Sequence, residues 1–179
     1  MKQRDGFTLI EILVVMGIMS LLAGLLMGGL NAAKGKAKKT QAKKEVSQIV
    51  TAWTAYYGDY KRFPDVVPNG SGETSYTITE MGRDAIRILQ GNYHGDWAGK
   101  NTRNTVYLDF HKEYTDQSDF NGYNDPWGNI YQVRLDKAPY DGEVSIPSIS
   151  GLKFSAVAWS MGPDEVDGTS DDVRSWEKR

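Results

Sequence analysis

An uncharged apolar run near the amino terminus constrains the fold of this chain more than any other feature. The 22 residues from Ile12 to Ala33 contain no charged side chain. As an α-helix they would be about 33 Å long, enough to cross the roughly 30 Å hydrocarbon core of a bilayer. In a secretory signal the apolar core is shorter and the small-residue cleavage site follows it. Here the small residue, Gly6, precedes the run, so we expect a membrane helix that the mature protein keeps.

A polar leader, residues 1–6, and a six-residue motif stand immediately before this run. The leader carries two basic residues, Lys2 and Arg4, and the motif reads Gly6-Phe7-Thr8-Leu9-Ile10-Glu11. Basic residues favour the cytoplasmic side of a membrane. The motif resembles the prepilin signature shared by type IV pilins and type II secretion pseudopilins. That resemblance implies that a dedicated membrane peptidase cleaves the chain after Gly6 and methylates the new amino-terminal Phe7.

Glu11 is a charged residue that a plain membrane anchor would not need. A charge deep in a membrane helix costs roughly 2.5–3.5 kcal/mol on insertion scales, so it normally has a partner. In the processed chain, the amine of Phe7 lies one helical turn away. The family resemblance implies instead that Glu11 pairs with the amino terminus of a neighbouring subunit and sets the stagger of a filament. The alternative is a glutamate at the membrane interface that reaches the headgroups.

The basic segment Lys34–Lys44 contains six lysines and no acidic residue. Such a segment after a membrane span would normally indicate the cytoplasmic side, whereas the prepilin motif implies that everything after the anchor lies outside. The leader is also basic, so charge alone leaves the topology open, and the expected topology follows from the prepilin motif. We therefore expect a single-pass protein of the bacterial inner membrane with its carboxyl-terminal domain in the periplasm.

Apolar periodicity predicts that the helix continues beyond the lysines to about Tyr57. Five apolar residues recur at steps of three and four, the pattern of an amphipathic helix: Val46, Ile49, Val50, Trp53 and Tyr57. Gly58 is expected to end the helix, and Phe63-Pro64 prevents its continuation. With 179 residues the chain suits one domain plus an anchor. The expected divisions are the leader at 1–6, a transmembrane and assembly segment at 7–33, an amphipathic helix at 34–58 and a globular domain at 59–179.

Shorter patterns in the globular part predict an α+β domain. We expect a short helix over 80–90, capped by Thr79, that buries Ala85, Ile86 and Leu89. Alternating or apolar stretches predict strands over 105–110, 130–135 and 154–159. The residues 125–129 predict a tight turn in which Trp127 is a structural residue packed in the core. Two histidines, His94 and His111, have no partner at metal-binding spacing and are expected at the surface.

Several later motifs narrow the resemblance. Arg62-Phe63-Pro64, then Asp125-Pro126-Trp127-Gly128-Asn129-Ile130-Tyr131, then Ser160-Met161-Gly162-Pro163-Asp164 resemble the major pseudopilin of type II secretion. The resemblance implies a type IV pilin-like fold, in which a long amino-terminal helix packs on a small antiparallel sheet. Many pilins close their carboxyl-terminal region with a disulfide. This chain contains no cysteine, which favours the pseudopilin.

The carboxyl-terminal stretch is the only one whose composition indicates site chemistry. Four aspartates lie within nine residues: Asp164, Asp167, Asp171 and Asp172. Carboxylate and carbonyl oxygens suit calcium, although the spacing does not fit an EF-hand. The stretch is similar to the pseudopilin calcium loop, which implies carboxylate ligands at Asp164, Asp171 and Asp172, with main-chain carbonyl ligands at Met161, Val166 and Thr169. A solvated acidic loop is the alternative. Without a cation the like charges should repel and the loop should open.

The sequence contains no nucleophile elbow and no phosphate loop. The resemblance implies a structural protein, and an enzyme with an unusual membrane anchor is a third alternative. The resemblance implies a pseudopilus subunit that assembles into a helical filament in the periplasm and drives protein export across the outer membrane. The implied partners are a prepilin peptidase and methylase, minor pseudopilins and an inner-membrane assembly platform. The net charge of −2 gives no reason to expect nucleic acid. The alternative is a type IV pilin of a surface fibre used in adhesion, motility or DNA uptake.

Overall fold

The computed structural model describes residues 7–66, 76–77, 79–91, 100–110, 122–136, 140–146 and 149–177, without the side chains of 25–29, 65–66 and 76–77. The chain divides into two compact units, residues 1–38 and 39–179. The second unit combines helices with small antiparallel sheets. The expected α+β class is therefore confirmed.

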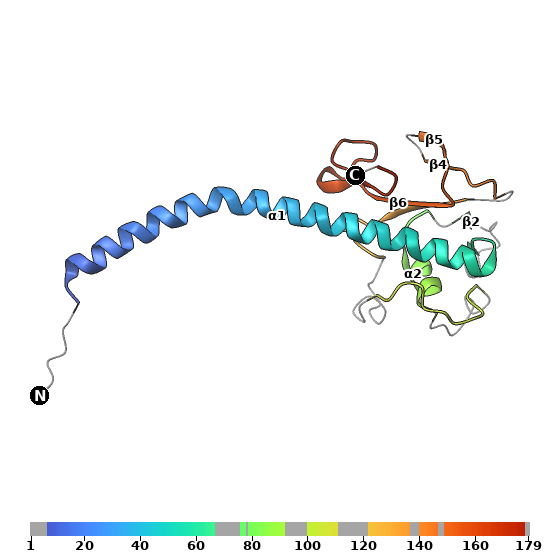
Figure 1. Ribbon diagram of the computed structural model, residues 1–179, viewed down its shortest axis with the longest axis horizontal. Coiled ribbons are helices and arrows are strands. Elements are labelled where there is room, and N and C mark those ends of the chain that lie inside the picture. Colours follow the sequence, from blue (N-terminus) through green and yellow to red (C-terminus); the bar gives the residue numbers. More distant parts are fainter. Residues whose placement is uncertain are drawn as a thin grey trace, which may run out of the picture. The chain divides into compact units, whose positions relative to one another are not determined.

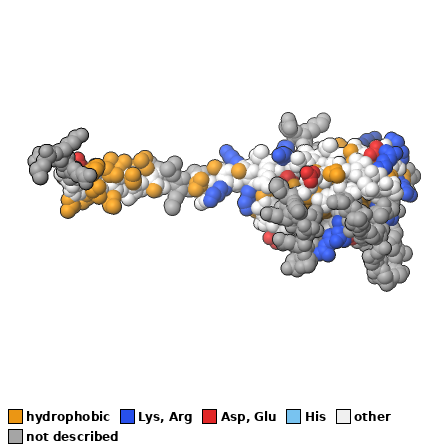
Figure 2. Space-filling view, turned by 90° about the horizontal axis from the view of Figure 1, so that it is seen from below, with side chains coloured by type: hydrophobic (Ala, Val, Ile, Leu, Met, Phe, Trp, Pro, Cys, Tyr) orange, Lys and Arg blue, Asp and Glu red, His pale blue; other side chains and the backbone are white. Residues whose placement is uncertain are grey.

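The first unit holds the beginning of α1 (Leu9–Tyr60), a helix of 52 residues. The expectation of one long amino-terminal helix is confirmed. Large apolar side chains remain exposed along its first turns, among them Leu9, Leu13 and Leu21, and Figure 2 shows this apolar segment. Among the residues whose side chains are described, no helix is both long enough and apolar enough for a membrane crossing.

The carboxyl-terminal end of α1 lies beyond the expected stop at Gly58. The helix continues through Gly58 to Tyr60, and Lys61 then adopts a left-handed conformation with φ 55°. A glycine inside a helix costs about 1 kcal/mol relative to alanine. The last turn nonetheless gains aromatic contacts, because Tyr56 stacks on Tyr60 with 4.6 Å between ring centroids. The prediction that Gly58 ends the helix is therefore wrong.

One face of α1 is buried in the second unit. Its buried residues are Ala42, Val46, Ile49, Ala52, Trp53 and Tyr56. Val50 and Tyr57 are only partly buried, so the buried face turns toward Tyr56 rather than Tyr57. A polar contact also holds the same helix, since the hydroxyl of Tyr131 donates to Glu45 Oε2 over 2.5 Å. The amphipathic continuation of the helix is confirmed.

The second helix, α2 (Arg83–Gln90), begins later than expected. Its N-cap is Gly82, and no side chain caps it. Residues 79–82 instead lie against the sheet, where the amide of Val133 donates to the carbonyl of Thr79 over 2.9 Å. The expected cap at Thr79 is thus wrong, because that residue is bonded to a strand. The predicted buried face is confirmed at Ala85, Ile86 and Leu89, with Ile88 in addition.

The main sheet of the described residues has the order β3–β6–β7, with β3 (Gln132–Leu135), β6 (Ala156–Ser160) and β7 (Val173–Arg174) all antiparallel. All five residues of β6 are buried. Ala156 and Ala158 face the cluster built by α1 and α2, whereas Val157 and Trp159 belong to a second cluster. The two later predicted strands are thus confirmed, with shifted ends.

The second cluster lies between β6 and a hairpin formed by β4 (Val144–Ile146) and β5 (Ile149–Leu152). Figure 1 shows this hairpin beside β6, on the side away from α1. A further pair, β1 (Asp65–Val66) and β2 (Tyr76–Thr77), follows the end of α1. The main sheet is therefore covered on both faces.

The strand expected over 105–110 is absent from the structure of those residues. The amides of Tyr107 and Leu108 both donate to the carbonyl of Leu89 at the end of α2. The buried Asn101 donates to the carbonyls of Ile88 and Thr105. Because these bonds go to α2 and to a side chain, the segment cannot pair as a strand, and the prediction is wrong.

Candidate functional sites

At the amino-terminal end of α1, Glu11 is bonded to its own chain. Its Oε2 accepts hydrogen bonds from the amide of Thr8 over 2.8 Å and from the hydroxyl of Thr8 over 2.7 Å. The amide of Glu11 lies 3.4 Å from the same hydroxyl oxygen, which accepts from it. This reciprocal arrangement is a capping box, in which threonine and glutamate three residues apart satisfy the free amides of a helix start.

Of the two residues at the predicted cleavage site, the structure describes only Phe7. Gly6 lies outside the described residues, whereas Phe7 is described and is 84% exposed. The Thr-x-x-Glu spacing of Thr8 and Glu11 is the sequence signal for this capping box. Glu11 therefore has a local partner in the single chain, which any partner from a neighbouring subunit would have to replace.

The aspartate-rich loop connects β6 to β7 and begins with a short 3₁₀ helix, η2 (Gly162–Asp164). Gly162 has a φ of 72°, and a Cβ placed there would lie 2.7 Å from Asp171 Oδ2 and 2.9 Å from the Asp171 carbonyl oxygen. Only glycine fits this conformation at such close approach. The two ends of the loop therefore touch at Gly162 and Asp171.

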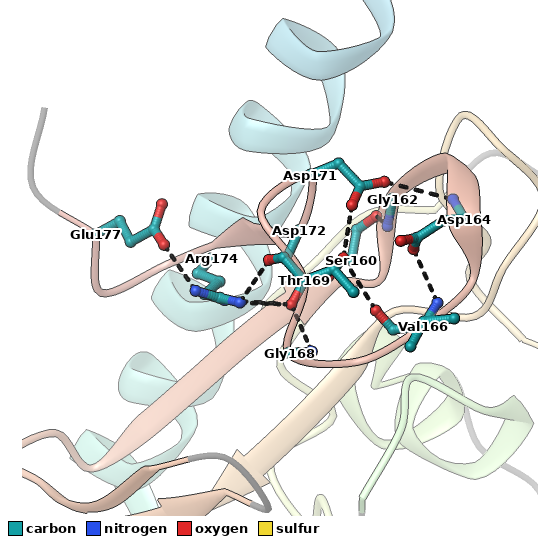
Figure 3. A network of polar contacts seen from close by, with 10 residues as sticks. All are labelled: Ser160, Gly162, Asp164, Val166, Gly168, Thr169, Asp171, Asp172, Arg174 and Glu177. Carbon is teal, nitrogen blue, oxygen red and sulfur yellow. Dashed lines mark hydrogen bonds and ion pairs between the residues drawn. The ribbon is translucent and has the colours of Figure 1, made fainter.

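A group of oxygen atoms surrounds the hydroxyl of Thr169 (Figure 3). Thr169 Oγ1 lies 2.6 Å from Asp171 Oδ1, 3.3 Å from Asp172 Oδ1 and 3.3 Å from the carbonyl oxygen of Val166. A hydroxyl has one proton and can satisfy only one of these acceptors at a time. Four oxygens from four residues thus converge, and all four residues are predicted ligands. For Thr169, however, the converging atom is the hydroxyl oxygen and not the predicted main-chain carbonyl.

Asp164 lies at the edge of this oxygen group. Its amide donates to Asp171 Oδ2 over 3.4 Å, and its own Oδ1 accepts from the amide of Val166 over 3.0 Å. The hydroxyl of Thr169 and, to a smaller extent, nearby amides lower the pKa of the Asp171 carboxyl. Asp171 is therefore a carboxylate at neutral pH, which is the form that binds a hard cation.

Asp172 is paired with an arginine that the sequence analysis did not single out. Asp172 Oδ2 accepts from Arg174 Nη2 over 2.8 Å and from the amide of Gly168 over 2.9 Å. Arg174 Nη2 also donates to the carbonyl of Thr169 over 2.8 Å, so that carbonyl, a predicted ligand, faces Arg174. The side chain of Asp172 raises the pKa of Arg174. The loop is closed in this structure, with Arg174 supplying positive charge.

The spacing of Asp172 and Arg174 was the available signal for this pair. Side chains two residues apart point to the same side of an extended chain. The strand β7, which begins directly after Asp172, carries Arg174 at its second position. Acidic residues alone indicate the metal ligands of the loop, and Arg174 is not among them. Met161, the remaining predicted carbonyl ligand, immediately precedes η2.

A buried aspartate ties the preceding turn to this loop. Asp125 Oδ1 accepts from the amides of Trp127, Gly128 and Asn129, each over 2.9 Å. Its Oδ2 accepts from the hydroxyl of Ser160, which in turn accepts from the amide of Gly162. The predicted turn over 125–129 is confirmed. Trp127 is only partly buried and belongs to neither core cluster, so its predicted place in the core is wrong.

The donor set of the loop fits the chemistry of a hard cation, since carboxylate, hydroxyl and carbonyl oxygens converge on one point. Within the described part of the chain, however, no three Asp, Glu, His or Cys side chains are grouped as a metal site. His94 and His111 lie outside the described residues.

Comparison with known proteins identifies a matching motif at the amino terminus and relatives of the whole chain. Residues 1–27 match the prokaryotic N-terminal methylation motif, so the amino terminus is that of a prepilin-type protein. Beyond this motif, the whole chain is similar to type II secretion system core protein G. The relative from Aeromonas hydrophila is 28% identical over 98% of this chain and 94% of its own length. The relative from Pectobacterium carotovorum is 29% identical, over 98% and 85% respectively.

A third relative of the same name, from Pseudomonas aeruginosa, is 28% identical and is matched over 97% of its length. No solved structure matches the chain. The resemblance to the pseudopilins of type II secretion, based on the motifs at both ends of the sequence, is confirmed.

Proposed function

We propose that this chain is a structural subunit, and the major one, of a type II secretion pseudopilus. The observation that carries this proposal is the similarity to three core G proteins over 98% of the chain. The prepilin-type motif at the amino terminus supports it independently. In this role the subunit performs no catalysis. It assembles into a periplasmic filament that drives protein export across the outer membrane.

The amino-terminal part of α1 supplies the anchor and the assembly segment in this proposal. Residues 7–33 cross the inner membrane once, and the carboxyl-terminal domain lies in the periplasm. The large apolar side chains exposed at the start of α1 support this placement, because an exposed apolar surface of this kind indicates contact with lipid or with other subunits. On assembly, the helices of neighbouring subunits cover the same surface.

The proposed partners follow from processing and assembly. A membrane peptidase cleaves after Gly6 and methylates Phe7, in keeping with the matched motif. The mature subunit then joins copies of itself, minor pseudopilins and an inner-membrane platform. Nucleic acid is not among the proposed partners.

One experiment on isolated filaments tests this proposal. We expect filaments assembled from this chain to stay within the periplasm, and their subunit to have the intact mass of a chain that starts at methylated Phe7. Electron microscopy and mass spectrometry of the same preparation provide the two measurements. Fibres that extend from the cell surface would favour a type IV pilin instead. A mature chain that starts beyond Ala33 would contradict the prepilin interpretation altogether.

We also propose that the carboxyl-terminal loop binds calcium. Asp164, Asp171 and Asp172 are the proposed carboxylate ligands, joined by carbonyl oxygens of Met161 and Val166. Thr169 contributes through its hydroxyl, which is the atom that lies among the carboxylates. Its carbonyl, which the family resemblance implied as the ligand, is bonded to Arg174. Bound calcium would neutralise the repulsion among the aspartates.

Calcium is therefore expected to raise the melting temperature of the full chain in detergent. At 100 times its Kd, a ligand of the native state adds about 2.7 kcal/mol, which corresponds to roughly 5–11 °C for a domain of this size. Calorimetry in calcium and in chelator gives the shift. Asp171→Asn should remove most of it, whereas Glu143→Gln, an exposed position outside the carboxyl-terminal loop, should retain it. Equal melting temperatures of the unmodified chain in the two conditions would mean that the loop is a solvated acidic segment that binds no calcium.

A further inference from the structure

We propose that Arg174 is a built-in cation of the carboxyl-terminal loop, which keeps the loop closed when no metal is bound. It also holds Asp172 so that the other oxygen of this carboxylate faces the proposed calcium site. The second statement rests on the proposed calcium site, and the first does not.

The pair formed by Arg174 and Asp172 is well enclosed. The side chain of Asp172 is fully buried and that of Arg174 is 18% exposed. A buried carboxylate without a partner is strongly unfavourable, because it has lost its water and gained nothing in return. Arg174 provides that partner through Nη2 at 2.8 Å and Nε at 3.3 Å. The burial of Asp172 thus depends on the guanidinium.

Arg174 also joins parts of the loop that are separate in sequence. Its Nη2 donates to the carbonyl of Thr169 and its Nη1 donates to Glu177 Oε1 over 3.0 Å. A guanidinium presents several donors in a rigid plane and can hold three acceptors at once, which an ammonium on a flexible stem does less well. One side chain on β7 therefore fixes residues before and after that strand.

The two oxygens of Asp172 have different environments. Oδ2 accepts from Arg174 and from the amide of Gly168, whereas Oδ1 lies 3.3 Å from the hydroxyl of Thr169. Asp171 Oδ1 approaches the same hydroxyl. The arginine therefore does not occupy the point where the oxygens converge. Arg174 orients the carboxylate of Asp172 and compensates its negative charge through Oδ2, which leaves Oδ1 facing the oxygen group.

This arrangement changes what is expected when calcium is absent. Loss of the metal leaves Asp164, Asp171 and Asp172 close together, but one of these charges is still compensated by Arg174. The loop should then be less stable yet closed. Without Arg174, the carboxylate of Asp172 keeps the hydrogen bond from the Gly168 amide but loses its ion pair. The metal then becomes the sole source of positive charge among the residues of this network (Figure 3).

Limited proteolysis of the full chain in detergent tests this inference. A protease specific for glutamate reports on the loop at the exposed Glu165, and the exposed Glu143 serves as a site elsewhere in the same digest. In chelator, Arg174→Gln should be cleaved at Glu165 roughly tenfold faster or more than the unmodified chain, the factor expected for loss of charge-assisted hydrogen bonds. Cleavage at Glu143 should stay unchanged. Saturating calcium should slow the cleavage of the variant at Glu165.

Two further variants separate charge from packing. Arg174→Lys keeps the positive charge but not the planar set of donors, and should restore part of the protection. Arg103→Gln, which removes an exposed arginine paired with Asp59 at 3.1 Å, should behave like the unmodified chain. Calorimetric titration adds a second measurement, in which Arg174→Gln should bind calcium several-fold more weakly because Asp172 is no longer oriented.

The proposal is overturned if Arg174→Gln is cleaved at the unmodified rate in chelator, or if Glu143 is cleaved faster by the same factor, which would mean global unfolding. A lysine variant cleaved as fast as the glutamine variant would likewise contradict closure by charge. A glutamine variant that opens in chelator but stays open in saturating calcium would overturn the calcium site alone, since closure by Arg174 would stand on the chelator result.

Discussion

Replacing Glu11 by alanine is expected to abolish filament assembly while leaving the chain in the membrane. The substitution removes a charge that costs roughly 2.5–3.5 kcal/mol in the centre of a bilayer, so insertion should be unaffected or improved. Assembly should fail because the amino-terminal amine of the neighbouring subunit loses its proposed partner. Electron microscopy of sheared filaments, with membrane fractionation of the same cells, measures both effects.

Thr8→Ala is the matched control for this substitution, because Thr8 is the partner of Glu11 within the single chain. The control removes the capping hydroxyl, at a cost of about 0.5–2 kcal/mol to the helix, and keeps the charge of Glu11. It should assemble close to the normal level. If Glu11→Ala forms filaments in normal number and with normal stagger, the capping box is the main role of Glu11 and the assembly assignment is wrong.

Trp53→Ala is expected to have the largest effect on stability. Trp53 is completely buried on α1, where its indole nitrogen donates to the sulfur of Met81 over 3.4 Å and its ring meets those of Tyr56 and Phe63 edge to face. Truncating a buried tryptophan to alanine costs about 3–5 kcal/mol. For a domain of this size the melting temperature should fall by roughly 6–20 °C, as measured by calorimetry in detergent.

Trp127→Ala is the matched control, since it removes the same side chain from a partly exposed position outside both core clusters. Its effect on the melting temperature should be much smaller. Equal losses for the two substitutions would mean that Trp127 packs in the core, as the sequence analysis had predicted.

The helical part of the fold could be predicted because its signals are local. The spacing of Val46, Ile49 and Trp53 indicated a buried helical face, and the structure buries all three. The helix ends later than its glycine indicated, because the stacking of Tyr56 on Tyr60 in the last turn outweighs the local preference of one glycine. The strand predicted over 105–110 failed for a related reason: whether an apolar segment forms a strand depends on a partner, and here the partner is the end of α2.

The aspartates of the carboxyl-terminal loop were identified from composition and family resemblance, and several of their oxygens converge in the structure. The compensating charge was not identified. The partners of a buried carboxylate come from the geometry of the folded loop, and an arginine two residues away is not part of an acidic motif. For the same reason the tie from Asp125 through Ser160 to Gly162 could not be predicted, since it joins residues 35 positions apart.

The position of β6 has a consequence for how the domain folds. This strand separates the two hydrophobic clusters, yet it comes from residues 156–160 of a chain of 179 residues. The buried face of α1 is synthesised much earlier and stays without this partner until the segment about a hundred residues downstream has followed. Such non-local contacts slow folding and leave apolar surface open to aggregation in the meantime. The domain can therefore complete its core only after β6 has been synthesised.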